Sequence, residues 1–233
     1  RSFEEIVKST GEEPLPLSIC YRCPTSVLDL ARELCPEIEA RPGAPVGVVR
    51  TIRDSDLAGQ VAEGDMILCR ITAPLVKACF ELIADGLPAT VRGRNIGEGL
   101  CKLVDKIAKS YSFELFGEGV DAWEQTEADV LAHRITDEDQ LEELVQAVRD
   151  QASCLRIFFS KIASTASTYD ALKGEIEALF SDERTSIVLS TIHRAKGLEC
   201  GRVFILAPAL LRKPRARMSW QLAQEHNLHY VAI

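Results

Sequence analysis

Six short apolar runs, several of them rich in β-branched residues, constrain the fold of this chain more than any other feature. The runs lie at residues 16–20, 46–52, 66–70, 89–93, 186–191 and 203–207. Runs of this length and composition predict strands that are buried on both faces, which is typical of a parallel or mixed sheet.

Helical patterns separate several of the predicted strands. After "YRCP", apolar side chains recur at helical spacing from Pro24 onward, at Val27, Leu30, Ala31 and Leu34. The segment 73–86 repeats this layout with Leu75, Ala78, Cys79 and Leu82, and it stops at Gly86. Strand and helix therefore alternate along the chain, and an α/β fold is expected.

The middle of the chain, from about Gly97 to Asp182, has a different character. Strand-like runs disappear, and helical periodicity continues through Leu141, Leu144, Val145 and Val148. Thr136, just before the acidic stretch "DEDQ", is the predicted N-cap of that helix. The sheet is expected to resume at Ile187, so the middle is predicted to be an inserted all-α subdomain.

Composition narrows the classes of function. The 233 residues are 46% hydrophobic, which suffices for a buried core, and 27 Lys and Arg stand against 35 Asp and Glu, for a net charge of -8. An acidic chain does not coat nucleic acid through bulk charge, so any DNA contact must be local. Eight scattered cysteines and no apolar run of membrane-spanning length indicate a cytoplasmic protein.

The stretch "TIHRAKGLE", residues 191–199, is the strongest candidate for chemistry. It follows a predicted buried strand, at the sheet edge where open α/β folds bind ligands. Arg194 or Lys196 could meet a phosphate, and Glu199 could accept hydrogen bonds from ribose hydroxyls. Gly197 lets the backbone turn before the next strand. The competing interpretation is a solvated turn.

Arg22, in "CYRCP", is the second candidate. It lies directly after one predicted strand and before a helix, and a guanidinium suits multidentate phosphate contact. A surface salt bridge is the alternative. Cys20 and Cys23 have no second close pair, and the four histidines do not cluster, so neither a metal site nor thiol-redox chemistry is expected. The chain also lacks the phosphate-binding loop G-x-x-x-x-G-K-[ST].

Four segments, taken in order, resemble the second motor domain of superfamily 1 DNA helicases of the UvrD/Rep/PcrA type. "LSICYRCPTSVLDLA" is similar to helicase motif IV, and "MILCRITAPLVKACFELIADGLPATVRG" to the strand-Arg-helix-strand module that follows it. "VLSTIHRAKGLECGRVFIL" matches motif V closely. "QEHNLHYVAI" is similar to motif VI, cut before the Thr-Arg that usually follows.

The resemblance implies a fold and its domains. The fold would be a RecA-like, mostly parallel sheet flanked by helices. Residues 1–98 would form the first part of the 2A motor domain, 99–184 a short helical insertion in the place of subdomain 2B, and 185–233 the remainder of 2A. The chain has no initiator Met and ends within an apolar run, so we expect a fragment of a longer protein.

The resemblance also implies roles for individual residues. Arg22 would approach the γ-phosphate of ATP, Glu199 would lie near the ribose, and Gly197 would line the nucleotide cleft. Thr191, His193 and Arg70 would contact single-stranded DNA. No residue of the chain is expected to bind a metal. The P-loop and the Mg²⁺ ligands would belong to an N-terminal RecA-like domain that precedes Arg1.

The implied function is that of half a motor. The parent protein would be an ATP-dependent helicase that moves along single-stranded DNA, usually 3′ to 5′ in this family, and this chain alone would be inactive. Two alternatives stay open at this stage. One is a non-catalytic helicase-like module that binds DNA or a protein, and the other is the motor part of a RecB-like helicase-nuclease.

Overall fold

A computed structural model describes residues 3–11, 18–162, 168–180, 187–212 and 219–233. By their contacts these residues form two compact units. The first comprises residues 1–51 together with Ile233, and the second comprises residues 52–232. No helix in the described part of the chain is long and apolar enough to cross a membrane.

The first unit is small. It contains α1 (Phe3–Thr10), β1 (Ile19–Cys20), α2 (Thr25–Ala31) and β2 (Glu39–Ala40), and its two strands pair in parallel. Strand β1 confirms the end of the run at 16–20, of which residues 16 and 17 lie outside the described residues. Leu28, Ala31 and Ile38 form its core. The face of α2 is therefore offset from the predicted one, since Leu30 is exposed.

The strand predicted at 46–52 is wrong. These residues have no regular structure, and Val46, Val48 and Val49 are exposed. The reason is local, because Gly47 has a φ of +72°, and a Cβ there would lie 2.6 Å from side-chain atoms of Pro24. Hydrogen bonds from the amides of Thr25 and Ser26 to residues 45 and 46 hold this segment against the start of α2 instead.

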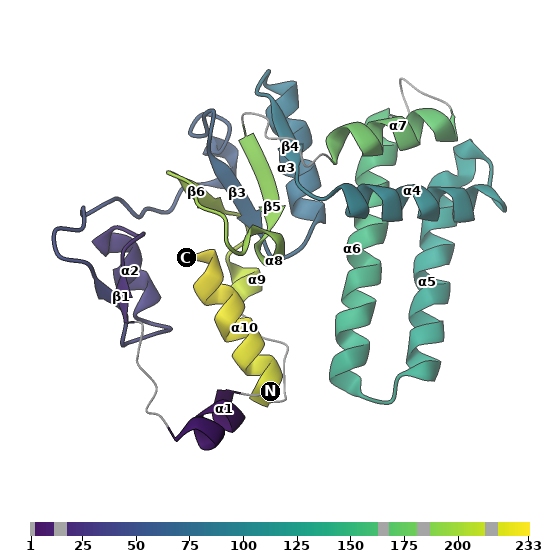
Figure 1. The fold of residues 1–233 in the computed structure, drawn as a ribbon. Coiled ribbons are helices and arrows are strands. Elements are labelled where there is room, and N and C mark those ends of the chain that lie inside the picture. Colours follow the sequence, from purple (N-terminus) through teal and green to yellow (C-terminus); the bar gives the residue numbers. More distant parts are fainter. Residues whose placement is uncertain (1–2, 12–17, 163–167, 181–186, 213–218) are drawn as a thin grey trace. The chain divides into compact units, whose positions relative to one another are not determined.

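The second unit is built on a four-stranded sheet in the order β4-β5-β3-β6, with every pair parallel. Its strands are β3 (Met66–Cys69), β4 (Ala89–Val91), β5 (Ile187–Thr191) and β6 (Val203–Ile205). They confirm the four runs predicted in this part of the chain. Together with the helices around it, this sheet gives an α/β, RecA-like fold (Figure 1).

Both faces of strand β3 are covered, as the apolar runs predict. Ile67 and Cys69 belong to the main core, whereas Leu68, between them, belongs to a second cluster. Helix α3 (Ala73–Ala84) packs on the first face against β3, β4 and β5. The second cluster contains residues of α8 (Ile192–Ala195), α9 (Ala209–Arg212) and α10 (Ser219–Ala232). The alternation follows from the two-residue period of a strand.

Among the described residues, four helices lie between β4 and β5. They are α4 (Arg94–Ala108), α5 (Phe116–Arg134), α6 (Glu138–Ile162) and α7 (Tyr169–Leu179). This unit also has two short 3-10 turns, η1 (Asp54–Asp56) and η2 (Phe113–Leu115). Helices α5 and α6 form a long antiparallel pair that extends away from the sheet (Figure 1). Whether 99–184 corresponds to subdomain 2B stays a prediction.

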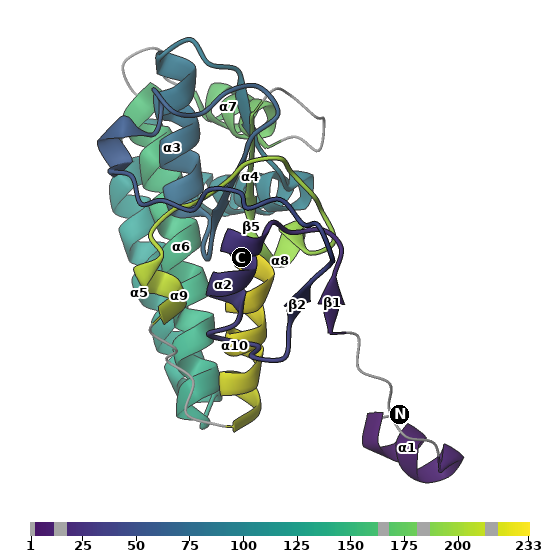
Figure 2. The same cartoon turned by 90° about the vertical axis from the view of Figure 1, so that its left-hand side faces the viewer.

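These helices share one hydrophobic core with the sheet. Phe116, Phe158 and Ile176, from α5, α6 and α7, belong to the same buried cluster as Val91 and Leu189 of the sheet. Figure 2 shows α3 beside α6, and Phe80 of α3 meets Phe158 of α6 edge to face with ring centroids 5.2 Å apart. The inserted helices are therefore packed against the sheet through a shared core and are not joined to it by the chain connections alone.

The start of α6 corrects one detail. Asp137, rather than Thr136, accepts a hydrogen bond of 2.8 Å from the backbone N–H of Gln140 in the first turn. An aspartate satisfies such an amide at least as well as a threonine does, and its charge suits the helix dipole.

Candidate nucleic-acid and nucleotide site

The carboxyl ends of β3 and β5 meet at one edge of the sheet. Cys69 and Thr191, the last residues of these adjacent strands, are paired in register. Arg70 therefore follows β3 at the place where Thr191 leads into α8 and His193. The structure thus brings together the three residues predicted to bind DNA, although they are far apart in the sequence.

Arg70 is held by an acidic partner. Its Nη2 donates to Oε1 of Glu225 over 2.7 Å, and its Nε donates to Oε2 over 3.4 Å. Both side chains are 23% exposed, so the pair is partly shielded from water. Glu225 lies on α10, in the motif VI-like segment, 155 residues from Arg70. An incoming phosphate must therefore compete with this carboxylate for the guanidinium.

His193 belongs to the same cluster. Its pKa is lowered from the ordinary value of 6.5, first by the desolvation that surrounding protein causes and then by the positive charge of Arg70. The carboxylates of Glu225 and Glu143 oppose this shift. At neutral pH the imidazole is therefore mostly uncharged, and Arg70 carries the positive charge of the cluster.

Gly197 sits in a tight turn. The amide of Leu198 bonds to the carbonyl oxygen of Ala195 over 2.8 Å, and Gly197 has a φ of +86° at the third position of that turn. A turn of this type places a glycine there because side chains disfavour positive φ. No heavy atom lies within 4 Å of where its Cβ would be, so the turn faces open space. Its nucleotide role stays a prediction.

Lys196 within that turn and Glu199 directly after it are both exposed. Arg194 precedes the turn and contacts another element. The guanidinium of Arg194 donates to the side chain of Asn95 at the start of α4, on the neighbouring strand's side of the edge. Of the two cations that the sequence offers for phosphate contact, Arg194 is thus engaged within the protein, and Lys196 is the more accessible.

Arg22 belongs to the first unit. It is exposed in the loop between β1 and α2, at the end of a strand of the two-stranded sheet rather than of the four-stranded sheet that contains β5. The other five predicted site residues belong to the second unit. The contact of Arg22 with the γ-phosphate of ATP therefore stays a prediction.

Two residues near the edge were missed by sequence reasoning. Glu225 lies in the segment "QEHNLHYVAI", in which nothing indicates its partner. Asp150 lies in α6, and its carboxylate accepts from the backbone N–H groups of Thr72 over 2.9 Å and Ala73 over 2.8 Å. For Asp150 the sequence signal was indirect. Pro74 predicts the first turn of a helix, and the backbone N–H groups of the two residues before it have no acceptor within that helix.

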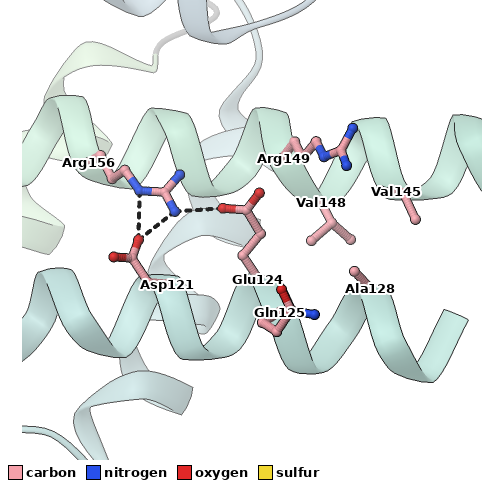
Figure 3. A pocket seen from close by; sticks show the side chains of 8 residues that line it. All are labelled: Asp121, Glu124, Gln125, Ala128, Val145, Val148, Arg149 and Arg156. Atoms are coloured by element: carbon pink, nitrogen blue, oxygen red, sulfur yellow. Dashed lines mark hydrogen bonds and ion pairs between the residues drawn. The ribbon is translucent and has the colours of Figure 1, made fainter. Parts of the chain in front are cut away.

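A separate hollow of about 270 Å³ lies between α5 and α6. Figure 3 shows that Arg156 bridges Asp121 and Glu124 at one end of it, with distances of 2.6 Å to each. Its other lining residues are Gln125, Ala128, Val145, Val148 and Arg149. None of the residues predicted to bind DNA or nucleotide lines this hollow.

Comparison with known proteins adds one match. A family model described as the UvrD-like helicase C-terminal domain matches residues 98–233, which is more than half of the chain. A search of curated proteins finds no match. The matched region includes the loop after β5 and helix α10, which carry His193 and Glu225.

Proposed function

The chain belongs to the family of UvrD-like helicase C-terminal domains, and from this premise we propose that it is the second motor domain of an ATP-driven translocase on single-stranded DNA. A first RecA-like domain on its N-terminal side would supply the P-loop and the Mg²⁺ ligands. The present chain would supply the other wall of the ATP cleft and part of the DNA track. Movement in the 3′ to 5′ direction is part of this proposal.

One observation carries the DNA part of the proposal. Arg70, Thr191 and His193 lie together at the carboxyl edge of β3 and β5, which is the edge where open α/β sheets bind ligands. An arginine beside a hydroxyl and an imidazole can hold a backbone phosphate and leave the bases unread. A local cluster of this kind suits a chain with a net charge of -8.

The nucleotide part rests on the loop after α8 and on Arg22. The open space beside Gly197 and the exposed carboxylate of Glu199 leave room for a ribose that donates hydrogen bonds to Glu199. Arg22 would place positive charge near the γ-phosphate, where charge develops during phosphoryl transfer. ATP would thus draw the two motor domains together, and hydrolysis would release them.

The test uses the full open reading frame that carries this chain. Its ATPase rate is measured with and without a poly(dT) oligomer, for the natural protein and for Arg22→Ala and Glu199→Ala. We expect strong stimulation by DNA, with turnover reduced by about a hundredfold or more in Arg22→Ala and less in Glu199→Ala. Lys109→Ala, an exposed cation after α4, is the matched control.

Each failure points to a different part of the proposal. Unchanged turnover in Arg22→Ala contradicts the γ-phosphate role. DNA binding without any ATPase activity, in a reading frame that lacks a P-loop, favours a non-catalytic helicase-like module instead. For the chain alone, millimolar ATP is expected to leave the melting temperature unchanged, because half a cleft gives ATP few partners.

A further inference from the structure

The loop between β3 and α3 carries Arg70, and its backbone depends on a side chain from the inserted helices. Helix α3 begins at Ala73, and its N-cap residue Thr72 makes no side-chain capping bond. Thr72 and Ala73 are both buried, with 8% exposure each. Their amides therefore need a partner within the protein, and Pro74 has no amide to offer.

Asp150 is that partner. Its two carboxylate oxygens accept separately, Oδ2 from the amide of Thr72 and Oδ1 from the amide of Ala73. A carboxylate at a helix N-terminus is favoured both by these bonds and by the helix dipole. The contact spans more than 75 residues of sequence, and it ties the middle of α6 to a point two residues after Arg70.

The rest of α6 holds Asp150 rigidly in place. Cys154 and Phe158 follow at four-residue intervals on the same face, and they are 1% and 0% exposed. Phe158 in turn packs edge to face on Phe80 of α3. Helix α6 is therefore fixed against α3 by packing as well as by the carboxylate, and the position of Asp150 is set by the core.

We propose that Asp150 is a positioning residue for DNA binding, which fixes the Arg70 loop so that the guanidinium faces the strand edge beside His193. The inserted helical region thereby contributes to the DNA site without touching DNA. This inference rests on the proposed function, because it assumes that Arg70 meets a phosphate of single-stranded DNA.

The experiment compares the chain with its Asp150→Ala, Asp150→Asn, Arg70→Ala and Asp150→Ala/Arg70→Ala variants. Binding to a fluorescein-labelled dT oligomer is titrated at several salt concentrations, and melting is followed by circular dichroism. Asp137→Ala is the matched control, since the carboxylate of Asp137 also caps a helix, at the start of α6 and away from Arg70. Asp150→Asn keeps the size of the side chain if Asp150→Ala does not fold.

We expect Arg70→Ala to weaken binding about tenfold and to flatten the slope of log affinity against log salt by about 0.7, which is the loss of one phosphate contact on a single strand. Asp150→Ala is expected to weaken binding by about three- to tenfold with the same change in slope, and Asp150→Asn by about threefold. The double variant should bind no more weakly than Arg70→Ala, because the two residues act through one contact.

Three results would overturn the inference. The first is natural affinity and salt slope in a folded Asp150→Ala or Asp150→Asn variant while Arg70→Ala binds weakly. The second is a loss of affinity in the double variant equal to the sum of the single losses. The third is a loss of affinity in Asp137→Ala as large as that in Asp150→Ala. If Arg70→Ala itself binds DNA as the natural chain does, the proposed DNA role of Arg70 fails, and the positioning role fails with it.

Discussion

Two arginines of the second unit, each paired with acidic residues, differ in what surrounds them. Arg70 joins the end of β3 to Glu225 of α10, one cation to one carboxylate, with His193 beside it. Arg156 joins α6 to α5 and meets two carboxylates, Asp121 and Glu124. Arg70 thus contacts one carboxylate directly, whereas Arg156 contacts two.

Under the proposed function, this difference separates a DNA-binding pair from a structural one. A phosphate that approaches Arg70 can replace a single carboxylate and gain the full guanidinium. A phosphate that approaches Arg156 must displace two carboxylates from the same guanidinium. The position of the two pairs agrees with this, since only Arg70 lies at the carboxyl ends of parallel strands. The same residue type therefore predicts function at one place and helix pairing at the other.

The largest expected effect separates the two arginines directly. Arg70→Ala should weaken binding of single-stranded DNA about tenfold, whereas Arg156→Ala should leave the affinity unchanged. Fluorescence anisotropy with a dT oligomer at fixed salt measures both. Equal losses in the two variants would mean that a general loss of positive charge, rather than the strand edge, determines binding.

The second prediction concerns Glu225, the carboxylate that pairs with Arg70. Glu225→Gln keeps the size of the side chain but removes the charge that competes with phosphate, so DNA affinity should rise about threefold. Glu124→Gln is the matched control at the other arginine, with no expected change. A fall in affinity of Glu225→Gln would show that the carboxylate orients Arg70 more than it competes for it.

The third prediction concerns stability, which Arg156→Ala should lower although it leaves DNA affinity unchanged. Arg156→Ala leaves Asp121 and Glu124 without their shared cation between α5 and α6. Since these groups are partly exposed, the free energy of unfolding should fall by only about 1 kcal/mol. Urea denaturation followed by circular dichroism measures this change. A loss several times larger would indicate that the hairpin depends on this cluster rather than on its packing.

The smallest effect concerns pH. The folded chain binds a proton at His193 less tightly than the unfolded chain does, because its pKa is lowered from 6.5. Protonation below about pH 6.5 therefore costs stability, while it adds a positive charge beside Arg70. Between pH 7 and pH 5.5 the natural chain should gain about twofold more DNA affinity than His193→Gln. If DNA affinity changes with pH to the same extent in the two proteins, the role of His193 in this pH dependence is contradicted.

Much of the second unit could be predicted from sequence. The runs 66–70, 89–93 and 187–191 became strands with buried residues, the run 203–207 became the edge strand β6 with Val203 exposed, and the segment 73–86 became α3 with its four predicted apolar residues in the core. The strand at 46–52 failed because its valines find no partner strand and Gly47 turns the backbone. Local composition predicts a strand only where neighbours cover it.

The candidate site was predicted in part, for a related reason. Thr191 ends one strand and is followed by His193, Arg70 follows another strand, and parallel strands bring their carboxyl ends to one edge. Asp150 and Glu225 come from helices distant in sequence, and their partners are set by tertiary packing. No spacing rule connects such residues, so sequence patterns could not find these two contacts.

The most direct test of the proposed DNA site at the ends of β3 and β5 is to map where DNA contacts the chain. A single-stranded oligomer with photoreactive thymidine analogues is cross-linked to the protein, and the modified peptides are identified by mass spectrometry. We expect cross-links at Arg70 and in the segment 191–193, which disappear when unlabelled oligomer competes. Cross-links concentrated on α5 and α6, with none at the ends of β3 and β5, would contradict it.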